Sequence, residues 1–138
     1  MADLIRFGVA MEKKLLDRFD REIKEKNYSN RSEAIRDLIR KNLIEQEWEK
    51  KGEVSGAIVF VYNHHKRELV NTLMDIQHDF HEVIISTQHI HLDHDNCLEI
   101  VVVKGGVEDV KKLFDKLRSA KGVKHCTLAK TTIGRDLV

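Results

Sequence analysis

The feature that most constrains the fold is a single strand-like segment near the start of the chain. Helical patterns follow it, and no second strand pattern lies nearby to pair with it. Over residues 4–11, apolar residues alternate with small or charged ones, which is the period of a β-strand. One face would carry Ile5, Phe7, Val9 and Met11, and the other Arg6, Gly8 and Ala10. A lone strand has no hydrogen-bond partner for its backbone, so this segment needs a strand from elsewhere.

Two amphipathic helix patterns follow this segment. In the first, apolar residues recur at spacings of three and four from Leu15 to Ile23. Asn30 and Glu33 are spaced as a capping box for the second, whose apolar stripe reaches Trp48. One strand and two helices bury most apolar surface by pairing with a second copy, strand against strand and helices around each other. The pattern therefore predicts a ribbon-helix-helix homodimer over residues 1–49.

The remainder of the chain, residues 54–138, alternates between strand and helix patterns after a short linker at residues 50–53. We predict strands at 54–62, 82–92, 97–104 and 123–131, and helices at 65–80 and 107–121. In the last helix we expect Val110, Phe114 and Leu117 to face the core. The order βαββαβ is the ferredoxin-like split motif, so the fold class is α+β. Several strands are apolar on both faces, which predicts that the face without helices meets another subunit.

Composition narrows the classes of function. No apolar run reaches the roughly 18 residues that a membrane-spanning helix needs, and the first residues lack the basic-then-apolar order of a secretory signal. Two cysteines do not make a disulfide framework. We therefore expect a cytoplasmic protein with no membrane partner. With a net charge of +1, a surface for double-stranded DNA must be local or built by oligomerisation.

Histidines are concentrated between residues 64 and 94, and some have the spacing of metal ligands. His89 and His91 are two apart on a predicted strand, so both imidazoles can meet one ion. The hairpin return brings Cys97 within reach, and a thiolate is a strong, soft ligand. His78 offers a fourth ligand from the preceding helix. Three imidazoles and a thiolate suit nickel, copper, zinc or cobalt, rather than calcium or magnesium.

The direction of His78 suggests a mechanism. Winding its helix from Leu69 at about 100° per residue places His78 on the side opposite the apolar stripe. A ligand that faces away from its own core can most easily serve another chain. We therefore predict that His78 completes the metal site of a neighbouring subunit. We interpret His94 as a turn residue and Cys126 as a buried thiol.

The predicted two-stranded ribbon has the width to enter the major groove of DNA. Arg6 could bond a guanine edge through two donors, while its small neighbours offer shape or contact with a thymine methyl. The start of the second helix would hold a phosphate through its free N–H groups and dipole. The predicted DNA contacts are Arg6, Gly8, Ala10, Asn30, Arg31 and Ser32.

Over nearly the whole chain, these residues resemble the NikR family of nickel-responsive repressors. Residues 30–37 are similar to that family's second-helix start, and residues 95–100 to its segment around the cysteine. The steps of eleven, two and six along His78, His89, His91 and Cys97 match its nickel-ligand pattern. The resemblance implies a homotetramer, a dimer of dimers around an ACT-type version of the ferredoxin-like core. It also implies square-planar Ni(II), one ion per chain, and repression of nickel-uptake genes.

Further residues gain a role only through this resemblance. It implies a second cation site, for an ion such as K+, on carboxylates that match Glu33 and Asp37. Tyr62 and His64 match positions near the nickel shell. Some family members carry hydroxyl side chains where Gly8 and Ala10 stand, which bears on the operator sequence but not on the binding mode.

Three alternatives stay open on the residues alone. The effector could be copper, zinc or cobalt, because the affinity of such ligands for divalent metals peaks at copper. A metal-dependent hydrolase would need an open coordination position and a general base, and four protein ligands leave neither evident. We therefore expect no enzyme activity and no small organic substrate. A metal-storage or chaperone protein would bind metal without metal-dependent DNA binding.

Overall fold

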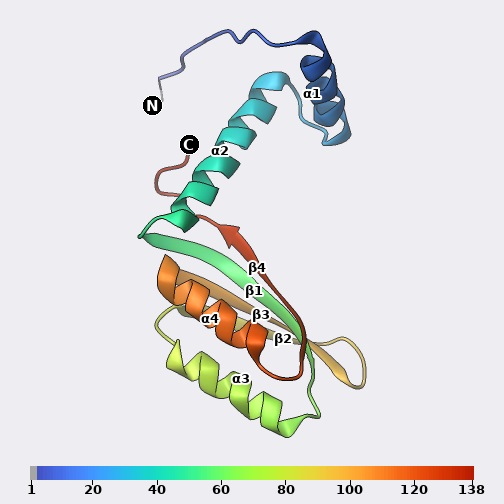
Figure 1. The fold of residues 1–138 in the computed structure, drawn as a ribbon, viewed down its shortest axis with the longest axis vertical. Helices are drawn as coiled ribbons and strands as arrows, with labels where there is room; N and C mark the ends of the chain where they lie inside the picture. Colours follow the sequence, from blue (N-terminus) through green and yellow to red (C-terminus); the bar gives the residue numbers. More distant parts are fainter. Residues whose placement is uncertain (1–2) are drawn as a thin grey trace. The chain divides into compact units, whose positions relative to one another are not determined.

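The structure, a computed structural model, describes residues 3–138, and the chain forms two compact units, one ending at Lys41 and the other starting at Asn42. The elements are α1 (Lys13–Glu25), α2 (Arg31–Glu49), β1 (Glu53–Asn63), α3 (Arg67–Asp79), β2 (Ile84–His91), β3 (Asn96–Gly106), α4 (Val107–Ser119) and β4 (Val123–Thr131) (Figure 1). Helix α2 begins in the first unit and ends in the second.

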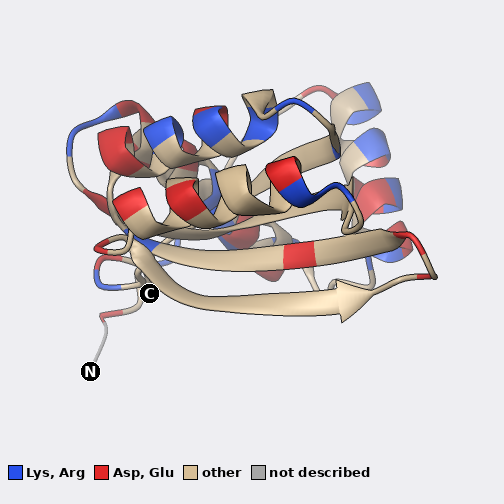
Figure 2. Ribbon diagram, turned by 90° about the horizontal axis from the view of Figure 1, so that it is seen from below, with Lys and Arg blue, Asp and Glu red and all other residues tan. Residues whose placement is uncertain are grey.

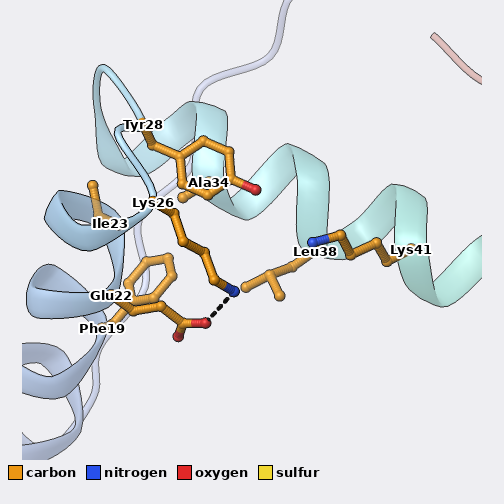
Figure 3. A pocket seen from close by; sticks show the side chains of 8 residues that line it. All are labelled: Phe19, Glu22, Ile23, Lys26, Tyr28, Ala34, Leu38 and Lys41. Atoms are coloured by element: carbon orange, nitrogen blue, oxygen red, sulfur yellow. Dashed lines mark hydrogen bonds and ion pairs between the residues drawn. The ribbon is translucent and has the colours of Figure 1, made fainter.

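The N-terminal unit has a small core between α1 and the first turns of α2. Figure 3 shows Phe19 and Ile23 of α1 beside Ala34 and Leu38 of α2. Ile23 and Ala34 are buried, whereas Leu38 remains half exposed. At the rim, the ammonium of Lys26 donates to the carboxylate of Glu22. Two short helices therefore bury few side chains within one chain.

The cap of α2 is formed by half of the predicted capping box. The side-chain oxygen of Asn30 accepts the backbone N–H of Glu33 at 2.8 Å, as the sequence predicts. The reciprocal bond from the Glu33 carboxylate is replaced by ion pairs with Arg36 and Arg40 on the same helix. Nearby guanidinium groups compete for the carboxylate more strongly than a backbone N–H does.

The segment over residues 3–12 carries no strand in the single chain, where the second copy that the sequence analysis expects to pair with it is absent. Ile5, Phe7 and Val9 are 84%, 72% and 62% exposed. They border an open groove of about 880 Å³, whose other wall includes Leu16 and Ile35 from the two helices. An alternating pattern becomes a strand only when a neighbour accepts and donates its backbone hydrogen bonds, and one copy of this segment has no such neighbour.

The C-terminal unit is a four-stranded antiparallel sheet in the order β2-β3-β1-β4, with α3 and α4 on one face (Figure 1). This confirms the predicted βαββαβ fold. The helices cover the inward side chains of the two central strands. The fully buried core includes Val54, Ile58, Phe60, Val101, Val103, Leu73, Val110, Leu113 and Leu117.

Two details of the helices differ from the prediction. Helix α3 begins at Arg67 rather than His65, because the side chain of Asn63 accepts the His65 backbone N–H at 2.9 Å and forms a turn. In α4, Leu113 takes the inward position that we assigned to Phe114. Phe114 is only half-buried and lies beneath the guanidinium of Arg118, which covers its outer face.

On the sheet face opposite the helices, the two central strands, β1 and β3, present an apolar surface. Ala57, Val59, Val61, Ile100 and Val102 lie on it and are half-buried in the single chain. Figure 2 shows that Lys, Arg, Asp and Glu gather on the helices, whereas the strands are mainly uncharged. None of the helices in residues 3–138 is both long enough and apolar enough to cross a membrane.

The end of α2 is anchored in the sheet unit. Trp48 is 1% exposed, and its indole N–H donates to the carbonyl oxygen of Thr131 at 2.9 Å. Beside it, β1 and β4 approach so closely at Gly56 that a Cβ there would lie 2.5 Å from the carbonyl oxygen of Ala129. Glycine is therefore required at this contact.

Candidate metal centre and DNA-binding unit

The register of the sheet places three of the four predicted ligands on one face near the turn between β2 and β3. His91 of β2 pairs with Cys97 of β3, which pairs with Tyr62 of β1. His89 pairs with Glu99 in the next row of the same face. Because side chains two apart on a strand share a face, these five groups project from the helix-covered side of the sheet.

Three potential ligands, one of them outside the four predicted, lie close together. The Cys97 Sγ is 3.8 Å from His91 Nδ1, and the ligand atoms of His64, His91 and Cys97 all lie within 4.8 Å of one another. His64 follows β1 and is held by its backbone N–H, which donates to the carbonyl oxygen of Asp95. Two imidazoles and a thiol are a fitting donor set for a late divalent metal such as nickel.

The thiol of Cys97 is protonated before any metal binds. Burial raises its pKa, and the nearby carboxylate of Glu99 raises it further. Only the thiolate coordinates, so metal binding must release this proton. The affinity for metal therefore falls as the pH is lowered.

The imidazole of His89 faces a second group of polar side chains. Its Nε2 hydrogen-bonds the hydroxyl of Tyr62 and lies 3.5 Å from the carboxylate of Glu99. The Tyr62 hydroxyl also donates to Glu99 at 3.0 Å, and Gln77 of α3 donates to the other carboxylate oxygen at 2.7 Å. Burial and the charge of Glu99 raise the pKa of Tyr62, so its hydroxyl keeps its proton.

Sequence reasoning missed the roles of Glu99 and Gln77. Glu99 is 4% exposed, a buried carboxylate that links a helix to the ligand strands. One signal was available. Glu99 shares the alternation of Cys97 and Val101 and so stands at an inward position of β3. Gln77 gave no comparable signal, because a polar residue at a helix edge is ordinary.

His78 lies apart from the other predicted ligands in the single chain. It is exposed on α3 and belongs to neither group of potential ligands found among residues 3–138. Its ring stacks with that of His81 at a centroid distance of 6.0 Å. His89 likewise belongs to neither group, so of the four predicted ligands only His91 and Cys97 are brought within reach of one ion among residues 3–138, although His89 shares their sheet face.

The residues predicted to contact DNA lie in the N-terminal unit. Arg6, Gly8 and Ala10 are on the exposed segment before α1. At the start of α2, Ser32 is exposed and Asn30 is occupied by its capping bond. Arg31 makes a two-pronged ion pair with Asp20 of α1, with bonds of 2.9 and 2.8 Å. This pairing lowers the pKa of Asp20, so the carboxylate stays charged and holds the guanidinium.

The two carboxylates expected at a second cation site already have cationic or hydroxyl partners. Glu33 pairs with Arg36 and Arg40. Asp37 accepts the hydroxyl of Tyr28 and lies 3.3 Å from the ammonium of Lys41. A bound cation would have to compete with these contacts.

The described features together define a class of protein, the metal-responsive DNA-binding regulators. They are an exposed alternating segment, two helices, and a sheet that carries imidazole and thiol groups. Residues 5–46 match the ribbon-helix-helix, CopG-family profile, and residues 55–131 match the NikR C-terminal nickel-binding domain. The chain belongs to the nickel-responsive regulator family, whose members are regulators and not enzymes.

Full-length relatives agree with this membership. A nickel-responsive regulator of Syntrophus aciditrophicus is 57% identical over 98% of both chains. One of Chlorobium limicola is 55% identical over 97% of this chain and all of its own. A solved structure of an uncharacterized Thermotoga maritima protein covers 59% of this chain and all of its own, with 15% identity and a TM-score of 0.54. That likeness concerns the fold alone.

Proposed function

We propose that this protein is a transcriptional repressor of nickel-uptake genes and that Ni(II) is its co-repressor. The observation that carries the proposal is the meeting of the Cys97 thiol with the imidazole of His91, 3.8 Å apart, on the strand face that also holds His89. In a chain that belongs to the nickel-responsive regulators and carries a ribbon-helix-helix domain, such a donor set is best used to sense metal.

We propose that each chain binds one Ni(II) through His89, His91 and Cys97, with His78 of a neighbouring subunit as the fourth ligand. The exposure of His78 supports a role across an interface. His89 would exchange its hydrogen bond to Tyr62 for the metal by turning about its side-chain bonds. Tyr62 and His64 would then stand beside the ligands, where Tyr62 keeps its bond to Glu99.

The assembly we propose is a homotetramer, a dimer of ribbon-helix-helix dimers joined through the sheet domains. The open groove beside Phe7 and Val9 supports the dimer, since a second copy would fill it with matching apolar side chains. The apolar sheet face with Val59 and Ile100 supports the contact between sheet domains. The functional modules would then be residues 1–49 and 54–138.

For DNA, we propose that the ribbon enters the major groove of a double-stranded operator with Arg6, Gly8 and Ala10 outward. Asn30, Arg31 and Ser32 would hold a phosphate at the start of α2, where the helix dipole favours an anion. Arg31 would exchange its pairing with Asp20 for the phosphate, or share its charge between them. The two free thiols fit a reducing compartment, and we place the protein in the cytoplasm.

A second cation, such as K+, would bind at Glu33 and Asp37 once DNA or metal binding rearranges their ion pairs.

The coupling of nickel binding to DNA binding would follow from a metal site whose ligands come from two chains. A ligand set completed across an interface favours the assembly in which the chains converge. Metal and operator would then strengthen each other's binding reciprocally, because both favour the same arrangement.

The experiment that tests this function is DNA binding by the full-length protein to a fragment of a nickel-uptake promoter, with and without Ni(II). We expect retardation of the fragment only when nickel is present, and loss of retardation on adding a chelator. Binding that is equally strong without metal, or absent with it, would rule out nickel as the co-repressor. Parallel titrations with Cu(II), Zn(II) and Co(II) test the choice of metal.

A further inference from the structure

A short turn joins two ligands of the candidate nickel site. His91 is the last residue of β2, Cys97 is the second residue of β3, and residues 92–95 connect the strands. The carbonyl oxygen of Asn96 closes the turn by accepting the backbone N–H of Leu92 at 2.9 Å. The position of one ligand relative to the other therefore depends on the conformation of this turn.

Within the turn, several N–H groups converge on the carboxylate of Asp93. Its Oδ1 accepts the backbone N–H groups of Asp95 and Asn96, at 2.9 and 2.8 Å, and the side-chain amide of Asn96 at 3.1 Å. Its Oδ2 lies 3.0 Å from the same amide nitrogen. Hydrogen bonds to a charged acceptor are stronger than those between neutral groups. These contacts fix the segment between the two ligands before any metal binds.

Strand β4 reaches the same turn through a β-bulge. The residues on either side of Lys124 pair with the consecutive residues Tyr62 and Val61 of β1, which leaves Lys124 as an extra residue without a partner in the ladder. A bulge bends a strand and redirects the side chain of the extra residue. The ammonium of Lys124 donates to the side-chain oxygen of Asn96 in β3, although β1 lies between β3 and β4 in the sheet. The bulge thus connects the far edge of the sheet to the turn.

We propose that three side chains form a brace that positions the ligands on either side of this turn for the metal ion. They are Asp93, Asn96 and Lys124. Asp93 belongs to neither group of potential metal ligands found among the described residues, so its effect on the metal acts through the turn. This inference rests on the proposed nickel site and identifies residues that hold its geometry. Ligands that are ordered in advance lose less conformational freedom when the ion binds.

The first test is the nickel affinity of the full-length protein, measured by equilibrium dialysis against a competing chelator, with the thiolate-to-metal absorption recorded in parallel. Asp93→Ala should lower the affinity about 10–100-fold, as loss of a residue that orients metal ligands usually does. The absorption band should also shift, because the Cys97 thiolate would meet the ion in a different geometry. Lys124→Ala removes one exposed contact and should lower the affinity about two- to fivefold.

Lys130→Ala is the matched control for Lys124→Ala. Lys130 is also an exposed lysine of β4, but it lies at the other end of the strand, where it pairs with Gly56. The variant removes the same charge from the same strand and should leave the affinity and the absorption band unchanged.

A second test exchanges the two partners within the turn. Asn96→Asp alone places two carboxylates side by side and should weaken nickel binding. The double variant Asp93→Asn/Asn96→Asp restores one carboxylate and one amide and should recover most of the affinity. Amide hydrogen exchange of the metal-free protein gives an independent measurement. The backbone amides of Asp95 and Asn96 should exchange faster in Asp93→Ala and near the parent's rate in the double variant.

Parent-like affinity and absorption in Asp93→Ala would overturn this inference. So would a double variant that binds nickel as weakly as Asn96→Asp alone, or an equal loss of affinity in Lys124→Ala and Lys130→Ala. Absence of thiolate absorption in the nickel-loaded parent would instead contradict the proposed nickel site, so the two failures are distinguishable. Circular dichroism establishes that each variant is folded.

Discussion

Apolar side chains are buried to different extents in the two units of this chain. In the C-terminal unit, Ile58, Val101 and Val110 have no exposed surface, and one chain closes its own core. In the N-terminal unit, Ile5 and Phe7 remain more than 70% exposed beside an open groove. Exposed apolar surface of this kind costs about 25 cal/mol for each Å² left in water. The C-terminal unit thus encloses its own core, whereas the N-terminal unit leaves exposed the apolar side chains that a second copy would cover in the proposed dimer.

Removing an apolar side chain of the ribbon should have the largest effect, and it tests whether the N-terminal unit depends on a second copy. We expect Phe7→Ala to destabilise the N-terminal dimer by about 3–5 kcal/mol per chain, because in the proposed assembly Phe7 is buried between two copies. DNA binding should be lost and the helices of the N-terminal unit should unfold at lower urea, as followed by circular dichroism. Nickel absorption should remain.

Arg6→Ala is the control for this change, since it alters the neighbouring residue on the opposite face of the ribbon. It should leave the urea midpoint of the N-terminal unit unchanged. An unchanged midpoint in Phe7→Ala as well would show that the single unit is stable alone and that the contrast between the units is wrong.

The corresponding change in the C-terminal unit is Leu113→Ala. Leu113 is fully buried within one chain, so we expect a loss of about 2–5 kcal/mol in the unfolding free energy of the sheet unit. Urea denaturation in excess chelator measures it, and the loss should not depend on protein concentration. Phe114→Ala should cost less because Phe114 is half-buried. The reverse ranking would restore the inward position that the sequence pattern gave to Phe114.

Substitutions of the metal ligands test whether the C-terminal unit binds nickel without a second chain, as it buries its core without one. Cys97→Ala should remove thiolate-to-metal absorption and lower nickel affinity by at least about 100-fold, a larger loss than supporting residues usually cause. His78→Ala should weaken binding but keep residual absorption. Equilibrium dialysis with a competing chelator measures both.

Mixing these two variants then locates His78. If it acts across an interface, mixed tetramers of His78→Ala and Cys97→Ala chains should regain complete sites, each joining an intact His78 to an intact trio. No regained absorption in tetramers whose composition has been verified by mass spectrometry would place all four ligands in one chain. The C-terminal unit would then bind the metal without a ligand from another chain.

The smallest effects concern DNA contacts at exposed side chains. Arg6→Ala should cost about 1–3 kcal/mol of specific binding and relax the preference for one base pair. Arg31→Ala should cost less and weaken binding to all sequences alike, because Asp20 already offsets much of its charge. Fluorescence anisotropy on operator and scrambled DNA separates the two. Equal loss on both DNAs for Arg6→Ala would remove it from the groove.

Much of this molecule was predictable from period and spacing. Alternation and helical stripes predicted the elements of the sheet unit to within a few residues, because its core is closed within one chain. The two-residue step from His89 to His91 predicted a shared face, and strand register bears this out. Where a partner was needed, as in residues 4–11, the pattern predicted a strand that one chain cannot form.

What escaped prediction depends on contacts distant in sequence. The pairing of Asp20 with Arg31 requires the packing of α1 on α2. The bond from Gln77 to Glu99 requires α3 to lie over β3. Spacing along the chain does not specify such pairs, because several surface residues could have met instead. For the same reason, the position of His64 beside Cys97 followed from the resemblance and not from the pattern.

The buried carboxylate of Glu99 sets the total charge that the candidate nickel site can hold. Before metal binds, its charge raises the pKa of Cys97 and so disfavours ionisation of the thiol. A divalent ion that displaces the thiol proton leaves one thiolate, one carboxylate and two positive charges, a sum of zero. A monovalent ion in place of the same proton would leave the charge of the carboxylate uncancelled, as it is before metal binds. A doubly charged ion at this site therefore gains a favourable interaction with Glu99 that a singly charged ion would not complete.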